Sequence, residues 1–207
     1  MTDRIKPLPQ LAGVNAYVPG EAPKYTGGPS YKLASNENPL GASPKAKAVY
    51  ADMGAKLEIY PDGTAKDLKA AIAKKHGLDA SRLVIGAGSD EIFLMLGRAY
   101  LGPGDESICT AHACAIYAII AQQQGSKIIE VAEKDFTADV DAILAAVTPK
   151  TKIVWLANPN NPTGTYIPYD EVKRLQAGLP ASVLLVLDGA YAEFVRKNDY
   201  ASGIELV

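Results

Sequence analysis

The stretch IVWLANPNNPTGTYIPYDEVKRLQAGLPASVLLVLDGAYAEF, residues 153–194, decides the predicted fold. It contains two apolar segments with the composition of buried strands, and a polar loop follows each. The first loop is Asn158–Gly164, and the second begins at Asp188. In an open parallel sheet, the loops at the carboxyl ends of the strands form the ligand crevice. We therefore expect Asn161, Asp188 and Tyr191 to face one site.

The rest of the chain alternates between apolar runs and segments with helical periodicity, separated by turn residues. Continuous apolar strands that alternate with helices predict an α/β fold, a mostly parallel sheet sandwiched by helices. The predicted strands are 83–86, 106–110, 127–132, 152–157 and 182–187. One predicted helix begins at Ser43-Pro44 and ends near Gly54, and a second begins at Thr64 and ends near Gly77. The other predicted helices are 89–100, 115–124, 139–147 and 169–178.

Composition divides the chain into three predicted segments. Residues 1–40 are rich in Pro and Gly and show no clear period, which is typical of an arm rather than a domain. Residues 41–80 contain two short predicted helices. The regular alternation of strands and helices occupies residues 81–207.

Charge and hydropathy exclude several classes of function. The net charge of −2 gives no electrostatic reason to expect nucleic acid or an anionic membrane as partner. Two cysteines predict neither a disulfide framework nor a metal site. The first ten residues lack the apolar segment of a signal peptide, and no apolar run approaches the roughly 20 residues of a membrane span. We expect a cytoplasmic protein.

The segment GAGSDE at 86–91 lies between a predicted strand and a predicted helix. Free N–H groups at a helix N-terminus favour a phosphate, Gly88 permits close approach, and Ser89 adds a hydroxyl. A plain capped helix explains the same residues, with Ser89 as N-cap and Asp90 and Glu91 in the first turn. A dinucleotide fingerprint fails because position 91 is Glu. A non-catalytic nucleotide-binding α/β module stays open as an alternative.

Each polar residue of the two loops also has a structural and a chemical interpretation. The two X-Pro steps of Asn158–Gly164 suit a stiff connection, whereas its Asn amides suit an aromatic hydroxyl or phenolate. Asp188 suits a helix cap, a ribose or metal ligand, or a partner that keeps a pyridine nitrogen protonated. Tyr191 suits core packing or a phenol in the site. His112 and Cys114 form a conceivable nucleophile pair, but no orienting acid is evident.

Several motifs, in their order and spacing, resemble those of the fold-type-I aminotransferases that depend on pyridoxal 5′-phosphate. They are LASNENPLG (33–41), YP (60–61), GAGSDE (86–91), NPNNPTG (158–164) and LDGAYAEF (187–194). Within this superfamily the chain is most similar to the histidinol-phosphate aminotransferases, from about Tyr17 onward. The resemblance implies that residues 81–207 form the first part of the large cofactor-binding domain. It also implies a homodimer that transfers an amino group between L-histidinol phosphate and 2-oxoglutarate in histidine biosynthesis.

The resemblance also implies roles for individual residues, which concern the cofactor phosphate, the cofactor ring and the substrate. Gly88, Ser89 and Asp90 would hold the cofactor phosphate, and Tyr60 would reach the phosphate in the neighbouring subunit's site. Asn161 and Tyr191 would bind the ring's O3′ oxygen, and Asp188 would pair with the pyridinium nitrogen. Tyr17 would contact the substrate phosphate, and Asn36 would line the substrate entrance.

The chain departs from the family pattern at three points. Cys114 stands where an aromatic side chain usually stacks on the cofactor ring, unless nearby Tyr117 takes that place. Gly189 stands where many members have Glu. The family's Schiff-base Lys follows the Tyr191 position by roughly 30 residues, which is past Val207. Lys197, in a charged loop, is predicted to be a surface residue.

We therefore expect a chain that ends before the Schiff-base Lys and is inactive alone, or at best binds the cofactor weakly. Two alternatives use the same residues with different consequences. A threonine-phosphate decarboxylase, or another aminotransferase of this group, shares the motifs and a phosphorylated substrate. A structural remnant would bind no ligand at all.

Overall fold

The computed structural model describes residues 6–14, 17, 24, 27–29, 31–32 and 34–207. Contacts divide the chain into two compact units, and each is described by itself. One unit comprises Met1–Asn15 and Gly86–Val207, and the other comprises Ala16–Ile85. The polar loops predicted to face one site both belong to the first unit.

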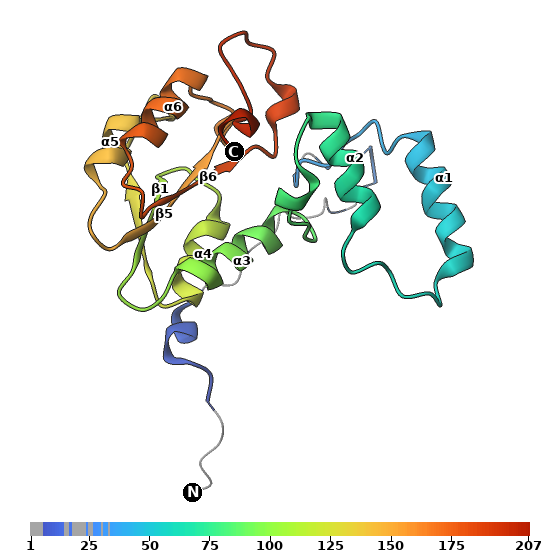
Figure 1. Cartoon of the computed structure of the whole chain (residues 1–207), viewed down its shortest axis with the longest axis horizontal. Helices are drawn as coiled ribbons and strands as arrows, with labels where there is room; N and C mark the ends of the chain where they lie inside the picture. Colours follow the sequence, from blue (N-terminus) through green and yellow to red (C-terminus); the bar gives the residue numbers. More distant parts are fainter. Residues whose placement is uncertain (1–5, 15–16, 18–23, 25–26, 30, 33) are drawn as a thin grey trace, which may run out of the picture. The chain divides into compact units, whose positions relative to one another are not determined.

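A four-stranded parallel sheet forms the centre of the first unit (Figure 1). Its strand order is β2 (Lys127–Val131), β1 (Glu106–Thr110), β5 (Thr151–Ala157) and β6 (Leu184–Asp188). Each neighbouring pair is parallel. The chain therefore places β2 on one side of β1 and then crosses back, so that β5 pairs with the other side of β1. The predicted fold class, a mostly parallel sheet with helices, is confirmed.

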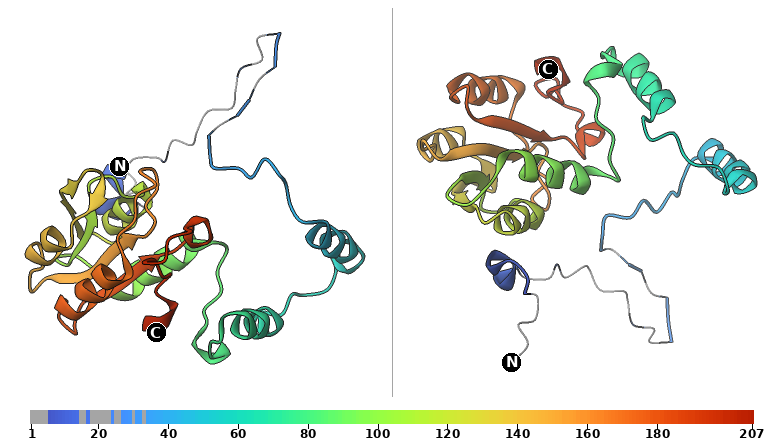
Figure 2. Two further views of the ribbon diagram at one scale, coloured as in Figure 1. Left: turned by 90° about the horizontal axis from the view of Figure 1, so that it is seen from above. Right: turned by 60° about the horizontal axis from the view of Figure 1, so that its bottom comes forward.

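Helices cover both faces of this sheet, as the right-hand view of Figure 2 shows. On one face, α5 (Val140–Ala145) and α6 (Tyr169–Gly178) share a core with Val154 and Leu156 of β5. On the other face, α3 (Ser89–Tyr100) and α4 (Ala115–Gln123) share a core with Ile153 and Trp155. Alternate residues of one strand point to opposite faces, so β5 contributes to both cores.

Three aromatic rings anchor the core beneath α3 and α4. Tyr117 and Trp155 stack in parallel, with centroids 5.3 Å apart and an interplanar angle of 4°. Phe93 meets each of them edge-on, at centroid distances of 5.3 and 5.8 Å. Tyr117 is completely buried and Trp155 is 1% exposed. Their positions are consequently fixed by packing from two helices and a strand.

Shorter elements complete the first unit. A 3₁₀ turn, η1 (Pro9–Gly13), packs against α4. An antiparallel pair that the sequence analysis did not predict, β3 (Glu133–Lys134) with β4 (Thr137–Ala138), reverses through Asp135 and Phe136 at positive φ. The 3₁₀ turns η4 (Ala192–Phe194) and η5 (Ile204–Leu206) follow β6.

The second unit consists of short helices with mostly exposed side chains. It contains α1 (Pro44–Met53), η2 (Gly54–Lys56), α2 (Lys66–His76) and η3 (Ala80–Arg82). The Ser43 hydroxyl accepts a hydrogen bond from the Ala46 N–H and caps α1, as predicted. Gly77 closes α2 in the left-handed conformation, also as predicted.

Three local predictions were wrong. Residues 83–86 join no described strand, and Val84 is 69% exposed. An apolar run becomes a strand only where it has a hydrogen-bonding neighbour. Thr64 does not cap α2. The Asp62 carboxylate instead accepts from the Thr64 N–H, two residues ahead, and from the Lys66 N–H, four residues ahead. Strand β6 begins at Leu184 because Val183 still belongs to a turn closed on Pro180.

Two classes of feature are missing from the described part of the chain. None of its helices is long and apolar enough to cross a membrane. The described His, Cys, Asp and Glu residues also include no group of three or more placed to hold a metal ion.

Candidate functional site

The carboxyl ends of β5 and β6 lie side by side, and both polar loops leave from this edge (Figure 1). The register pairs Ala157 with Asp188, the last residues of the two strands. One residue further, the Asn158 N–H donates to the Asp188 carbonyl oxygen at 3.0 Å. The predicted convergence of the two loops on one edge is therefore observed.

Internal hydrogen bonds hold the first loop in one shape. The buried Asn158 side chain donates to the Ile167 carbonyl oxygen at 3.1 Å and accepts from the Ile167 N–H at 2.9 Å, as a neighbouring strand would. Within the loop, the Asn160 N–H donates to Thr165 and the Gly164 N–H donates back to Asn160. The peptide bonds that precede Pro159 and Pro162 are both cis. The loop thus presents Asn161 from a fixed backbone.

Asn161 and Tyr191 meet at this edge of the sheet, and we call the edge that carries Asn161, Asp188 and Tyr191 the crevice. The Asn161 side-chain Nδ2 donates to the Tyr191 hydroxyl oxygen at 3.4 Å. Tyr191 comes from the loop after β6, directly before η4. An amide and a phenol are thereby brought together from two loops that are 30 residues apart in sequence.

Both oxygens of the Asp188 carboxylate accept hydrogen bonds. The Ala190 N–H donates to Oδ1 at 3.1 Å, and the Tyr117 hydroxyl donates to Oδ2 at 2.7 Å. Burial, followed by the negative charge of Asp188, raises the pKa of Tyr117 far above its ordinary value. Tyr117 therefore stays protonated and can only donate to the carboxylate at neutral pH.

The alternative that Tyr117 covers the cofactor ring is wrong. Its own ring stacks on Trp155 inside the core, so neither face is available to a ligand. Cys114 is the residue before α4 and is partly buried. The contact of Tyr117 with Asp188 was missed altogether, because no local pattern links residues 71 positions apart.

The predicted phosphate loop lies at the start of α3. Gly88, not Ser89, is the N-cap residue, with φ at 78°, and no side chain caps the helix from that position. Instead the Glu91 carboxylate accepts from the Ala87 N–H at 2.5 Å, because a Glu three residues into a helix can reach back. Gly88, Ser89 and Asp90 are all exposed, and a Cβ at Gly88 would meet nothing within 4 Å. A ligand can approach this backbone closely.

Three predicted contacts belong to the second unit. Tyr17 is 68% exposed and Tyr60 is 96% exposed. Asn36 has a positive φ of 50° in a turn. Their proposed contacts with substrate or with a neighbouring subunit stay predictions. Lys197 is exposed in a turn, as expected of a surface lysine.

His112 pairs with a carboxylate rather than with Cys114. Its ring Nδ1 lies 2.7 Å from Glu133 Oε2, and its backbone N–H donates to Oε1 at 3.1 Å. Phe136 packs edge-on against the imidazole. The Asn160 amide donates to the His112 carbonyl oxygen, so this pair supports the first loop. The structure therefore does not support a nucleophile pair of Cys114 and His112.

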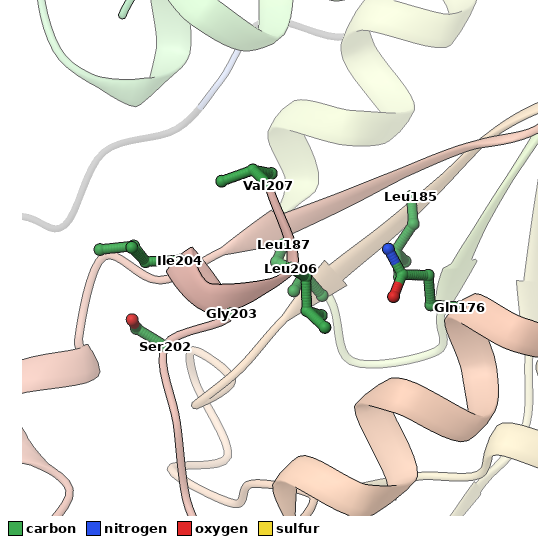
Figure 3. A pocket seen from close by; sticks show the side chains of 8 residues that line it. All are labelled: Gln176, Leu185, Leu187, Ser202, Gly203, Ile204, Leu206 and Val207. Carbon is green, nitrogen blue, oxygen red and sulfur yellow. The ribbon is translucent and has the colours of Figure 1, made fainter. Parts of the chain in front are cut away.

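A cavity of about 260 Å³ lies beside β6 (Figure 3). Its lining residues come from α6, β6 and the segment around η5: Gln176, Leu185, Leu187, Ser202, Gly203, Ile204, Leu206 and Val207. Both leucines pack toward the α5–α6 core, whereas Val186 packs toward the α3–α4 core. The cavity is therefore separate from the crevice that contains Asp188.

The donors and acceptors of the crevice fit pyridoxal phosphate. A carboxylate, Asp188, suits a protonated ring nitrogen, and the Asn161–Tyr191 pair suits a phenolate oxygen. The open backbone at Gly88, where a twelve-residue helix begins, suits a phosphate. No aromatic side chain stands at position 114 to stack on the ring.

Comparisons with known proteins give a consistent picture. A family model described as aminotransferase class I and II matches residues 29–207. Proteins named histidinol-phosphate aminotransferase from Rhodopseudomonas palustris strain BisB18 and from Nitrobacter winogradskyi are each 54% identical over 202 residues. The match covers 97% of this chain but 55% of each relative. The chain thus spans about half the length of these curated relatives.

Solved structures agree on the fold. The histidinol-phosphate aminotransferase from Sinorhizobium meliloti, in complex with pyridoxal-5′-phosphate, superposes with a TM-score of 0.78 at 27% identity. That match covers 81% of this chain and 46% of the other. The aspartate aminotransferase from Rhizobium meliloti gives a TM-score of 0.78 at 21% identity, over 97% of this chain and 55% of the other, which supports the fold alone.

Proposed function

This chain belongs to the aminotransferase class I and II family, and from that premise we propose that it takes part in pyridoxal phosphate-dependent transamination. The proposed reaction moves an amino group between L-histidinol phosphate and 2-oxoglutarate, in histidine biosynthesis. The observation that carries it is the convergence of Asp188, Asn161 and Tyr191 at the ends of β5 and β6. The 54% identity to relatives named histidinol-phosphate aminotransferase supports the substrate.

Each residue of the crevice has a distinct task in this proposal. Asp188 binds the ring N–H and, as a carboxylate, favours its protonated form. Asn161 and Tyr191 donate hydrogen bonds to the ring oxygen. Gly88, Ser89 and Asp90 hold the phosphate at the start of α3, where the first N–H groups of a helix have no partner within the helix.

The chemistry that bound pyridoxal phosphate would supply is that of an electron sink for the amino-bearing carbon of the substrate. The chain's own contribution is to bind and orient that ring and to keep a charged carboxylate against its nitrogen. Asp188 is half-buried and doubly hydrogen-bonded, so its charge is held in one place. Preorganised charge of this kind favours the transition state more than a mobile group does.

The second unit supplies the proposed substrate contacts. Tyr17 contacts the substrate phosphate and Asn36 lines the substrate entrance. Tyr60 reaches the cofactor phosphate of a neighbouring subunit, which makes the proposed protein a homodimer. We place this homodimer in the cytoplasm. The high exposure of Tyr60 supports a role outside its own unit. Cys114 borders the ring without stacking on it.

Equilibrium dialysis of the full 207-residue chain against pyridoxal phosphate tests cofactor binding. We expect measurable binding that weakens at least tenfold in Asp188→Ala and Asn161→Ala. Asp199→Ala is the matched control, because Asp199 also accepts a tyrosine hydrogen bond but lies outside the crevice loops. Equal binding by all four proteins would refute the cofactor assignment. It would instead favour the nucleotide-binding module, which predicts that Asp188→Ala leaves ligand affinity intact.

Substrate choice needs a separate measurement. The chain with pyridoxal phosphate is incubated with L-histidinol phosphate, threonine phosphate or phenylalanine, and the shift in thermal unfolding is recorded. We expect L-histidinol phosphate to give the largest shift. A larger shift with threonine phosphate would favour the decarboxylase alternative.

A further inference from the structure

The Asp188 carboxylate is held by two donors of different origin. Ala190, which donates to Oδ1, is only two residues away and moves with the same loop. Tyr117, which donates to Oδ2, comes from α4 on the far side of the α3–α4 core. Only the second bond ties the carboxylate to a part of the protein that does not move with its loop.

Tyr117 is itself one of the most rigidly placed side chains of the described chain. It is fully buried, lies flat against Trp155 and meets Phe93 edge-on. A side chain packed on both faces keeps one rotamer. Its hydroxyl oxygen therefore marks a fixed point 2.7 Å from Asp188 Oδ2.

Core packing alone does not explain the hydroxyl. Phenylalanine would fill the same space between Trp155 and Phe93, and it would need no polar partner. A buried hydroxyl is stable here only because it donates to Asp188. The partner chosen is the carboxylate at the crevice edge, although that carboxylate is only half-buried and open to solvent.

We propose that Tyr117 is a positioning residue that fixes the Asp188 carboxylate in the orientation needed to bind the ring nitrogen of pyridoxal phosphate. The inference rests on the proposed function and extends it to a residue outside the crevice. A carboxylate offers about four lone-pair positions, so two bonds leave two positions for the ligand. A hydrogen bond from a rigid residue that does not itself touch the ligand holds a binding group in the orientation that the ligand needs.

Tyr117→Phe removes the hydroxyl and keeps the ring. Tyr166→Phe is the matched control, because the Tyr166 hydroxyl donates to the Asp199 carboxylate at 2.8 Å, away from the crevice. The first readout needs no ligand. Three-bond NMR couplings of the Asp188 side chain report how many rotamers it occupies.

We expect one Asp188 rotamer in the unsubstituted chain and in Tyr166→Phe, and averaged couplings in Tyr117→Phe. A single rotamer in Tyr117→Phe would overturn the proposal. If that variant does not fold, the unsubstituted chain still decides. Its Tyr117 hydroxyl proton must then give a slowly exchanging signal close to the Asp188 side chain, and its absence would overturn the proposal.

The second readout compares two ligands by dialysis: pyridoxal phosphate and its 1-deaza analogue, in which carbon replaces the ring nitrogen. Tyr117→Phe should weaken pyridoxal phosphate about tenfold and leave the analogue unchanged, since the analogue has no N–H for Asp188. Equal losses for both ligands, or no loss for either, would contradict positioning through Asp188. An unsubstituted chain that binds neither compound refutes the proposed function, and the coupling measurement then judges Tyr117 alone.

Discussion

Asn158, the residue directly after β5, donates its backbone N–H to the carbonyl oxygen of Asp188, the last residue of β6, at 3.0 Å. The Asn158 side chain also pairs with the Ile167 backbone, so one residue joins the two strand ends and fastens the loop that carries Asn161. The position of the crevice thus depends on a residue that makes no proposed contact with a ligand.

Asn158→Ala should lower the free energy of unfolding by about 2–4 kcal/mol, because it leaves the buried N–H and carbonyl of Ile167 unpaired. Urea unfolding of the purified chain measures the change. Asn198→Ala, at an exposed position, should change the free energy by less than about 0.5 kcal/mol. Similar values for both variants would show that the Asn158–Ile167 bonds do not stabilise the loop.

Gly97→Ala should destabilise the α3–α4 face by about 1–3 kcal/mol. A Cβ at Gly97 would lie 2.3 Å from Ile120 Cγ2, so the two helices must separate. Gly102→Ala serves as the control, because its nearest atom would be 3.6 Å away. Thermal and urea unfolding should rank the control near the unsubstituted chain. A Gly97→Ala protein of unchanged stability would mean that the helices are not packed as described.

Glu133 should make the stability of the chain depend on acid pH. Burial opposes its ionisation, but hydrogen bonds from the Thr110 hydroxyl and from His112 outweigh that effect and hold the pKa of the Glu133 carboxyl below its ordinary value. A carboxyl with a lowered folded pKa stabilises the fold above its unfolded pKa, about 4.3. That contribution is lost as the pH falls through the lower folded pKa.

Glu133→Gln should accordingly reduce stability at pH 7 and show a smaller further loss between pH 5 and pH 3. Urea midpoints across this range give the measurement. Glu130→Gln, an exposed carboxylate on β2, should keep the full acid-induced loss. An unaltered acid limb in Glu133→Gln would exclude Glu133 as its source.

The two cysteines should differ in reactivity. Burial, followed by the nearby charges of Glu130 and Glu133, raises the pKa of Cys109 to about 12, so its thiolate is scarce at pH 8. Cys114 is only partly buried. In the folded chain, iodoacetamide should label Cys114 at least tenfold faster than Cys109, and in urea it should label the two at similar rates. Peptide mass spectrometry measures the labelling of each cysteine. Faster labelling of Cys109 in the folded chain would contradict its burial.

The sequence predicts the regular elements of the first unit well, because their signals are local. The bounds of α3 and α6 agree with the periodicity and flanking turn residues, and β1 agrees to the residue. The segment 83–86 failed because its apolar composition says nothing about a neighbouring strand. The β3–β4 pair was missed because strands of two residues are too short to show a period.

The crevice could be foreseen only in part, for a related reason. Asp188, Asn161 and Tyr191 follow strand ends, a position that sequence can locate, and parallel pairing then brings them together. Tyr117 lies mid-helix among apolar residues and looks like core. Its bond to Asp188 depends on how α4 is laid across the sheet, which no spacing encodes.

Trp155 gives the chain an intrinsic optical probe. It is the only tryptophan in the sequence, it is almost fully buried, and it lies against the ring of Tyr117, whose hydroxyl touches Asp188. Its fluorescence therefore reports events at the carboxylate through two direct contacts, without a label. A change in Trp155 emission on addition of a ligand would therefore report binding at the crevice.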